Sequence, residues 1–204
     1  MPVDVDVVAE TERAQALLAP ARLELLEHLA QPDSAAGLAR RLGLPRQRVN
    51  YHLRELESQH LIEVVEERRR GNCVERTYRR TGQAYTISTA ALGRLGTTPE
   101  DVQDRFSSAF QIALASRAVR ELGALQSGAR SARKKLPTFA LEVDVRFASA
   151  EARNAFAGEL ADAVAELVRK HHDEESRGGR AFRFYLGAYP RPRGAPPAAT
   201  GDAD

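Results

Sequence analysis

The sequence predicts an α+β protein in which N-terminal helices and a β-hairpin precede a long helix and a small β-α-β unit. Three observations support this prediction. Apolar residues recur every three or four positions over residues 12–59, as they do on one face of a helix. Residues 61–80 are instead rich in β-branched residues around a Gly-Asn pair, which is typical of a hairpin. Residues 139–147 alternate apolar and polar side chains and precede another helical pattern.

These patterns divide the chain into four predicted regions. Residues 1–96 hold the helices and the hairpin, and residues 97–136 hold a long linking helix. Residues 137–190 form the β-α-β unit, which we expect to serve dimerisation or effector binding. The tail, residues 191–204, is rich in Pro, Ala and Gly and is expected to be disordered.

The positive charge of the chain is concentrated in one segment. Residues 34–80 contain eleven Arg and six Glu, which gives +5 and leaves −3 for the rest of a chain whose formal net charge is +2. A basic segment on a mildly acidic body indicates a local site for a polyanion.

The cysteine count and the length of the apolar runs restrict the class of protein. The single cysteine excludes a disulfide within the chain, and no apolar run approaches the roughly 18 residues of a membrane span. Because the N-terminal residues also lack a signal-peptide layout, we expect a soluble cytoplasmic protein without a membrane partner.

The N-terminal elements follow from local signals. A helix is expected over 12–31 with a break near Pro20, and Asp33 or Ser34 can cap a short helix over 35–42. Gly43 supplies a tight turn, and Pro45 opens a helix that runs to about residue 59. The strands of the hairpin are expected at 61–70 and 73–80.

This order of elements is that of a winged helix-turn-helix, and residues 12–82 resemble the ArsR family of bacterial transcription regulators. The opening of the family pattern is matched by Leu17, Pro20, Arg22 and Leu23. Its recognition helix is matched by His52, Leu53, Arg54 and Leu56. Asn50 and Tyr51 stand where the family usually has a small polar residue and a His, which leaves the operator sequence open.

The helix after Pro45 has the size of helices that read the DNA major groove. Gln47 and Asn50 can donate to and accept from an adenine edge, and Arg48 can pair with guanine. Tyr51 offers its ring to a thymine methyl group and its hydroxyl to a phosphate. We assign phosphate contacts to Arg40, Arg41, Arg46 and Arg54, and a minor-groove or backbone contact to Arg68, Arg69 and Arg70 at the hairpin tip. The alternative is that these residues form a solvated face of a protein-interaction module, and the three tip arginines a solvated turn.

A second helical pattern runs from Pro99 to Ser127, with Thr98 and Asp101 as a capping box. Its broad apolar side needs a partner, and the family resemblance also suggests a dimer contact there. The predicted dimerisation residues are Val102, Phe106, Phe110, Ala113 and Leu114.

The β-α-β unit is predicted from strands at 139–147 and 181–189 around a helix that Ser149 caps and that runs to about His171. Two strands and one helix are marginal alone. The unit therefore either extends the dimer, which we favour, or binds a small apolar effector.

No residue pattern indicates catalysis, a metal or a cofactor. The helix at 35–42 lacks Cys, His and carboxylates, so the thiolate metal sites of some ArsR regulators are not expected. Enzyme motifs are also missing. The sequence thus predicts a homodimeric regulator, by default a repressor, that binds double-stranded DNA at a two-fold-related operator, with response to a small-molecule effector left open.

Overall fold

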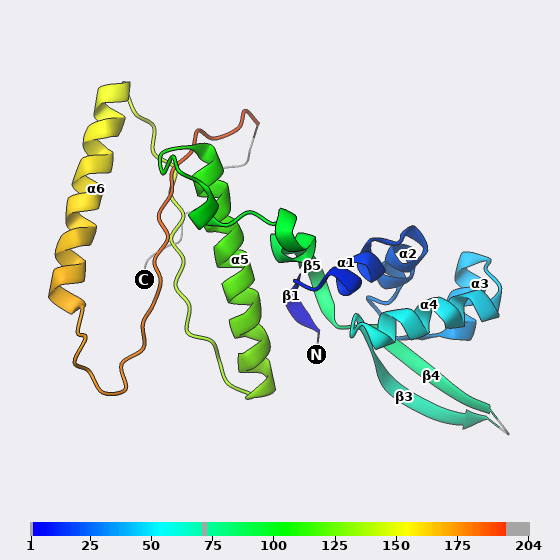
Figure 1. Ribbon diagram of the computed structural model, residues 1–204. Coiled ribbons are helices and arrows are strands. Elements are labelled where there is room, and N and C mark those ends of the chain that lie inside the picture. Colours follow the sequence, from blue (N-terminus) through cyan, green and yellow to red (C-terminus); the bar gives the residue numbers. More distant parts are fainter. Residues whose placement is uncertain (1, 71–72, 195–204) are drawn as a thin grey trace. The chain divides into compact units, whose positions relative to one another are not determined.

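The computed structural model describes residues 2–70 and 73–194, and the backbone contacts divide it into two units, residues 1–136 and 137–204 (Figure 1). The first unit holds a mixed arrangement of helices and strands. The second holds one helix between two extended segments. The predicted hairpin turn at residues 71–72 and the tail from residue 195 lie outside the described residues.

The predicted N-terminal helices are present. The first pattern is split at Ala19 into α1 (Thr11–Leu18) and α2 (Pro20–His28), and α3 (Ala35–Leu42) and α4 (Arg46–Ser58) follow. Their apolar faces meet in one core. Its fully buried side chains include Leu25, Leu29, Leu38, Val49, Leu53, Leu56 and Leu61.

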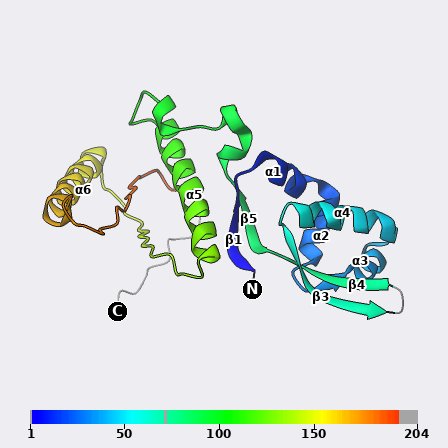
Figure 2. The same ribbon diagram turned by 60° about the horizontal axis from the view of Figure 1, so that its bottom comes forward.

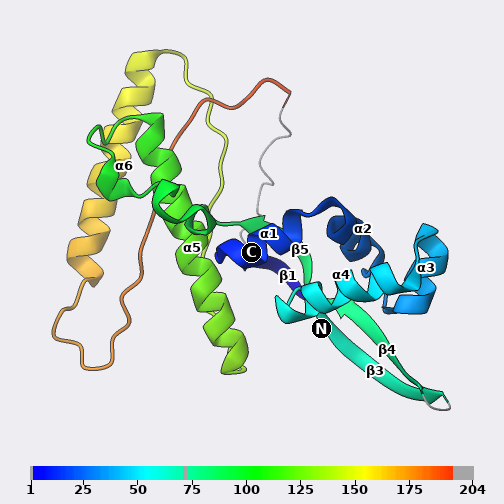
Figure 3. The same ribbon diagram turned by 45° about the vertical axis from the view of Figure 1, so that its right-hand side comes forward.

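Three strands form an antiparallel sheet in the order β2-β4-β3. Strand β3 (Ile62–Arg70) pairs with β4 (Cys73–Arg80), and the short β2 (Asp33–Ser34) pairs with the other edge of β4. The register shifts between Val64 and Glu66, so Val65 is an extra residue in the ladder. The hairpin projects away from the helices (Figures 1 and 3).

A second sheet has two parallel strands, β1 (Val3–Val8) and β5 (Gly82–Ile87), which lie side by side in Figure 2. Strand β1 was not predicted from the sequence. The alternation of Val and Asp over residues 3–8 was the available signal for a strand, but it does not give the buried face, because Asp6 and Val8 are buried whereas Val5 is exposed. This pairing brings the N-terminal strand back to the end of the hairpin.

The long helix begins later than predicted. Residues 89–95 and 99–101 form the 3₁₀ helices η1 (Thr89–Leu95) and η2 (Pro99–Asp101), and α5 spans Ser108–Ser131 rather than starting at Pro99. The Thr98 hydroxyl bonds the Asp101 carboxylate at 2.6 Å beside the short η2 turn. The Ser107 hydroxyl, which accepts from the Phe110 amide at 3.2 Å, caps α5 instead.

This boundary also separates the predicted dimerisation residues. Val102 and Phe106 precede α5, and the Phe106 side chain is 98% exposed. Phe110 and Leu114 lie half-buried on α5, whereas Ala113 is fully buried inside the first unit. The predicted stripe is therefore not one continuous helix face.

In the second unit the helix is as predicted, since α6 spans Ala150–His171 and the Ser149 hydroxyl accepts from the Ala152 amide. The flanking strands predicted at 139–147 and 181–189 are not formed, and both segments lack regular secondary structure. An ion pair of 2.8 Å between Arg191 and Asp144 links the two segments. A Phe147–Phe156 ring contact links the first of them to α6. Almost every described side chain of this unit is exposed, so residues 137–194 form no core that could order a sheet.

Candidate nucleic-acid interface

Helix α4 has one buried face and one exposed polar face. Val49, Leu53 and Leu56 are buried to 1% exposure or less and fix the helix on the core. On the other side Arg46, Gln47, Arg48, Tyr51 and Arg54 are exposed, and Asn50 is half-buried. Three apolar anchors therefore present most of the predicted base-contacting side chains to solvent.

The N-terminus of α4 is open. Its N-cap residue is Pro45, which offers no side-chain hydrogen bond to the first turn. Exposed amides at a helix N-terminus attract phosphate oxygens through their partial positive charge. The backbone of the first turn can thus support Arg46 in holding a phosphate.

The turn before α4 is built by α3. Ser34 caps α3 by accepting from the Gly37 amide at 3.2 Å, and Gly43 ends it in a left-handed conformation (φ 64°). A Cβ at residue 37 would overlap the carboxylate of Asp33, so a larger residue there would displace that side chain. Asp33 accepts from the Ser34 amide at 2.7 Å.

The two arginines of α3 differ in their surroundings. Arg41 lies 3.1 Å from Asp33 and is half-exposed, so its charge is already partly balanced. Arg40 is exposed, and no ion pair holds it within the described part of the chain. Of the two predicted phosphate contacts, Arg40 is therefore the one whose charge is less balanced by a neighbouring carboxylate.

His52 lies under the polar face, between the exposed Tyr51 and the buried Leu53. Its ring contacts Tyr51 edge-on at 5.3 Å, and neither ring nitrogen has a hydrogen-bond partner within the described residues. Burial, followed by the positive charges of Arg22 and Arg48, lowers the pKa of His52 from its usual 6.5. The neutral imidazole is therefore the form that suits this position. In the sequence, His52 was identified only as part of the family's recognition-helix pattern.

The arginines of the hairpin are largely paired with glutamates. Arg68 lies 2.7 Å from Glu66, and Arg76 lies 2.8 Å from Glu67. Such exposed pairs contribute only about 0–1 kcal/mol, so a phosphate can replace the carboxylate. Arg69 is also exposed on β3, and the side chain of Arg70 lies outside the described residues.

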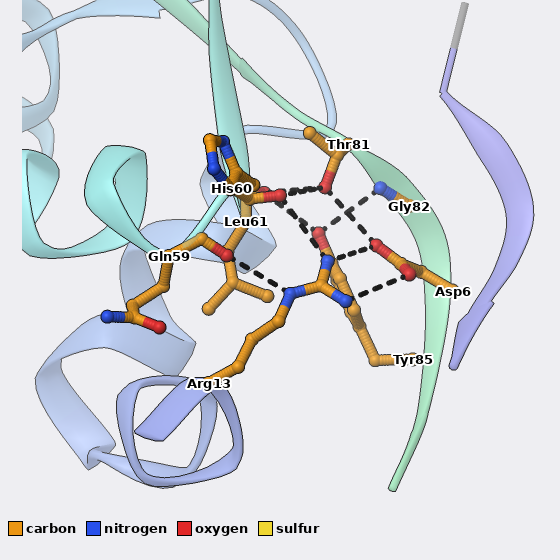
Figure 4. A network of polar contacts seen from close by, with 8 residues as sticks. All are labelled: Asp6, Arg13, Gln59, His60, Leu61, Thr81, Gly82 and Tyr85. Carbon is orange, nitrogen blue, oxygen red and sulfur yellow. Dashed lines mark hydrogen bonds and ion pairs between the residues drawn. The ribbon is translucent and has the colours of Figure 1, made fainter. Parts of the chain in front are cut away.

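A polar network, not predicted from sequence, fixes β1 to the end of α4 (Figure 4). The Arg13 guanidinium pairs with the Asp6 carboxylate at 2.6 Å and donates to the Gln59 carbonyl at 3.1 Å. The Tyr85 hydroxyl donates to the Leu61 carbonyl at 3.0 Å. The network positions the helix that carries the polar face relative to both sheets.

Within the described residues, no three His, Cys, Asp or Glu side chains converge as a metal site would require. None of the described helices is long and apolar enough to cross a membrane.

The helix-turn-helix segment of this chain is similar to known protein domains. Residues 17–65, from α1 to the start of β3, match the family model described as a helix-turn-helix domain. A crystal structure of a "possible transcriptional regulatory protein (fragment 1-100)" from Mycobacterium bovis is similar, with 29% identity over 35% of this chain and 73% of that chain and a TM-score of 0.29. NolR from Sinorhizobium fredii is also similar, with 25% identity over 35% of this chain and 68% of that chain and a TM-score of 0.29. A comparison with curated protein sequences gives no significant match. The segment that carries the polar face of α4 is therefore part of a helix-turn-helix domain.

Proposed function

We propose that this chain is a sequence-specific DNA-binding transcription regulator of the ArsR type that acts as a homodimer, by default as a repressor. The observation that carries the proposal is α4, whose apolar side is fully buried while Gln47, Arg48 and Tyr51 face solvent beside an uncapped N-terminus. Helices of helix-turn-helix domains present their N-terminal residues to base edges in this way.

The proposal gives each element a role. Helix α4 enters the major groove, where Arg48 pairs with guanine and Gln47 or Asn50 with adenine. Arg40, Arg46 and Arg54 hold phosphates. The β3–β4 hairpin acts as a wing that contacts the backbone or minor groove through Arg68 and Arg69.

A dimer would place two copies of α4 about one DNA turn, or roughly 34 Å, apart on a two-fold-related operator. The apolar side chains of the second unit support this assembly. No residue of α6 is buried within the described chain, and Phe156 and Leu160 are 42% and 43% exposed. A second copy of the chain is the occupant that this proposal assigns to that face.

The test is binding of the full chain to the DNA upstream of its own gene and to random DNA of equal length, across a salt series. We expect tighter binding to the upstream DNA, with affinity that falls as salt rises because phosphate contacts release counterions. In a variant carrying Arg48→Ala, Asn50→Ala and Tyr51→Ala, the preference should disappear. Each lost bidentate base contact should remove about 1–3 kcal/mol of discrimination.

A matched control uses Arg94→Ala, Gln103→Ala and Arg105→Ala, three exposed residues away from α4. This control should retain the preference. Equal binding of both DNAs would contradict sequence-specific readout. Absence of binding at every salt concentration, with the fold intact, would favour the alternative of a winged-helix module that binds another protein.

A further inference from the structure

An open cavity of about 680 Å³ lies at the surface of the first unit, beside the polar network of Figure 4. Its walls come from β1, the start of α1, the C-terminal end of α4 and the second half of α5. Its volume is within the range of small-molecule sites, roughly 300–1,000 Å³. The DNA-binding proposal makes no use of this cavity.

Helix α5 reaches the cavity through one face. Five of its lining residues lie three, four or seven positions from one another in most pairs, which keeps them on one side of the helix. They are Arg120, Gly123, Ala124, Ser127 and Arg130. The two arginines are separated by about 15 Å of helix. They therefore stand toward opposite ends of the α5 wall.

Two arginines of the cavity lining form no ion pair within the described residues. Arg13 is bound to Asp6, and the neighbouring Arg117 of α5, outside the lining, is bound to Glu100. Arg120 and Arg130, by contrast, have no carboxylate partner within the part of the chain that the structure describes. Counting Asp6 and Glu10 against the three arginines, the formal charge of the lining is +1 with His60 neutral.

The middle of the cavity wall is apolar and closely packed. A Cβ at Gly123 would lie 2.6 Å from the Cβ of Val7, so only glycine lets α5 approach β1 this closely. Val7, Ala9 and Ala124 offer apolar surface between the arginines. This contact also sets the separation of α5 from the strand that Asp6 and Arg13 tie to α4.

We propose that this cavity binds a small organic anion, whose apolar body lies against Val7, Ala9 and Ala124 and whose carboxylate pairs with Arg120 or Arg130. Arg favours this ligand class because its guanidinium can donate two parallel hydrogen bonds to a carboxylate. Ser58, Gln59 and His60 at the end of α4 also line the cavity. Bound anion therefore contacts both α5 and the helix that presents the DNA-binding face, and it serves as the effector of the regulator; this second statement rests on the proposed function.

The experiment titrates the full chain with 2-naphthoate and, in parallel, with the neutral 2-naphthalenemethanol. The chain contains no Trp, so the naphthalene fluorescence anisotropy reports binding directly. We expect saturable binding of 2-naphthoate and at least about tenfold weaker binding of the alcohol, because the alcohol lacks the charge-assisted hydrogen bonds.

The decisive variant is Arg120→Gln with Arg130→Gln, and the matched control is Arg94→Gln with Arg105→Gln. Both remove two charges from largely surface positions, but only the first pair lines the cavity. The first should weaken 2-naphthoate binding about tenfold or more and the second should not, since only cavity arginines form the ion pair. Equal binding by both variants, equal binding of acid and alcohol, or a Kd above about 1 mM in the unchanged chain would overturn the proposed site.

The same titration in the presence of upstream DNA separates the two proposals. Naphthoate that binds the free chain and changes DNA affinity supports the effector role. Naphthoate that binds a chain without DNA affinity leaves the site intact and refutes the proposed function. Naphthoate that binds without changing DNA affinity refutes the effector role.

Discussion

Helices α4 and α6 have similar apolar stripes, but the stripe of α4 is buried and the stripe of α6 is exposed. On α4, Val49, Leu53 and Leu56 are buried to 1% exposure or less. On α6, Leu160 is 43% exposed and Leu167 is 56% exposed, and no residue of the helix is buried. The comparison teaches that periodicity predicts a helix and its apolar face, whereas the surface that covers that face depends on the rest of the fold.

The largest expected effect contrasts leucines on the two helices. Leu53→Ala should destabilise the chain by about 2–5 kcal/mol, because it leaves a cavity in a packed core. Leu160→Ala should cost less than about 1 kcal/mol in dilute solution, because 43% of Leu160 is already exposed and the helix has no buried residue around it. Urea unfolding of both variants measures the difference. Equal losses would mean that α6 is covered within the single chain.

A dimerisation measurement tests whether a second copy of the chain covers the exposed apolar face of α6. If a second copy covers α6, then Leu160→Asp should raise the dimer dissociation constant by about 100-fold, or about 2.7 kcal/mol. Sedimentation equilibrium over a range of concentrations measures this. Glu159→Gln, a change on the polar side of the same helix, serves as the control. A dimer unaffected by Leu160→Asp would assign the interface to another surface.

Removal of an ion pair should also cost more stability in the first unit than in the second. Asp6 and Arg13 are 9% and 17% exposed, whereas Asp144 and Arg191 are 44% and 49% exposed. Asp6→Asn should cost about 1–3 kcal/mol because it leaves a mostly buried guanidinium poorly matched. Asp144→Asn should cost about 0–1 kcal/mol. Denaturant midpoints with unchanged slopes test both values, and similar losses would contradict the contrast.

The smallest effect is a pH dependence specific to the first unit. The pKa of His52 is lowered in the folded chain, first by burial and then by Arg22 and Arg48. Its contribution to stability is therefore full above the unfolded pKa of about 6.5 and is lost as pH falls through the lower folded pKa. Unfolding midpoints between pH 7.5 and pH 5, in the range where His titrates, should show a loss that His52→Gln reduces. An identical pH profile in that variant would exclude His52 as the cause.

Much of the first unit could be predicted because its local signals agree with its packing. Pro20, Ser34, Gly43 and Pro45 mark helix boundaries that the structure reproduces. The polar face of α4 was also visible in the sequence, because its buried positions follow helical spacing. What the family model matches, residues 17–65, is the part with the densest local signals.

The errors arose where an element depends on distant partners. Strand β1 was missed because its pairing with β5 spans most of the unit, although its alternation was present. The start of α5 was misplaced because Thr98 bonds Asp101 beside a 3₁₀ turn, and Ser107 provides the helix cap. The segments at 139–147 and 181–189 have a strand-like sequence pattern, but no core covers their apolar side chains within the described residues. The pattern alone therefore did not produce a sheet.

Strand β1 also has a consequence for how the chain folds during synthesis. The Asp4 and Gln83 side chains, which are hydrogen-bonded across the parallel sheet, are 79 positions apart in the sequence. At about 5–20 residues per second, the ribosome makes the later strand roughly 4–16 s after the earlier one. During that interval the helices can collapse, but Val8 and Asp6 have no strand to join. Closure of the parallel β1–β5 sheet is thus timed by translation, and the two sheets become connected only after the hairpin has emerged.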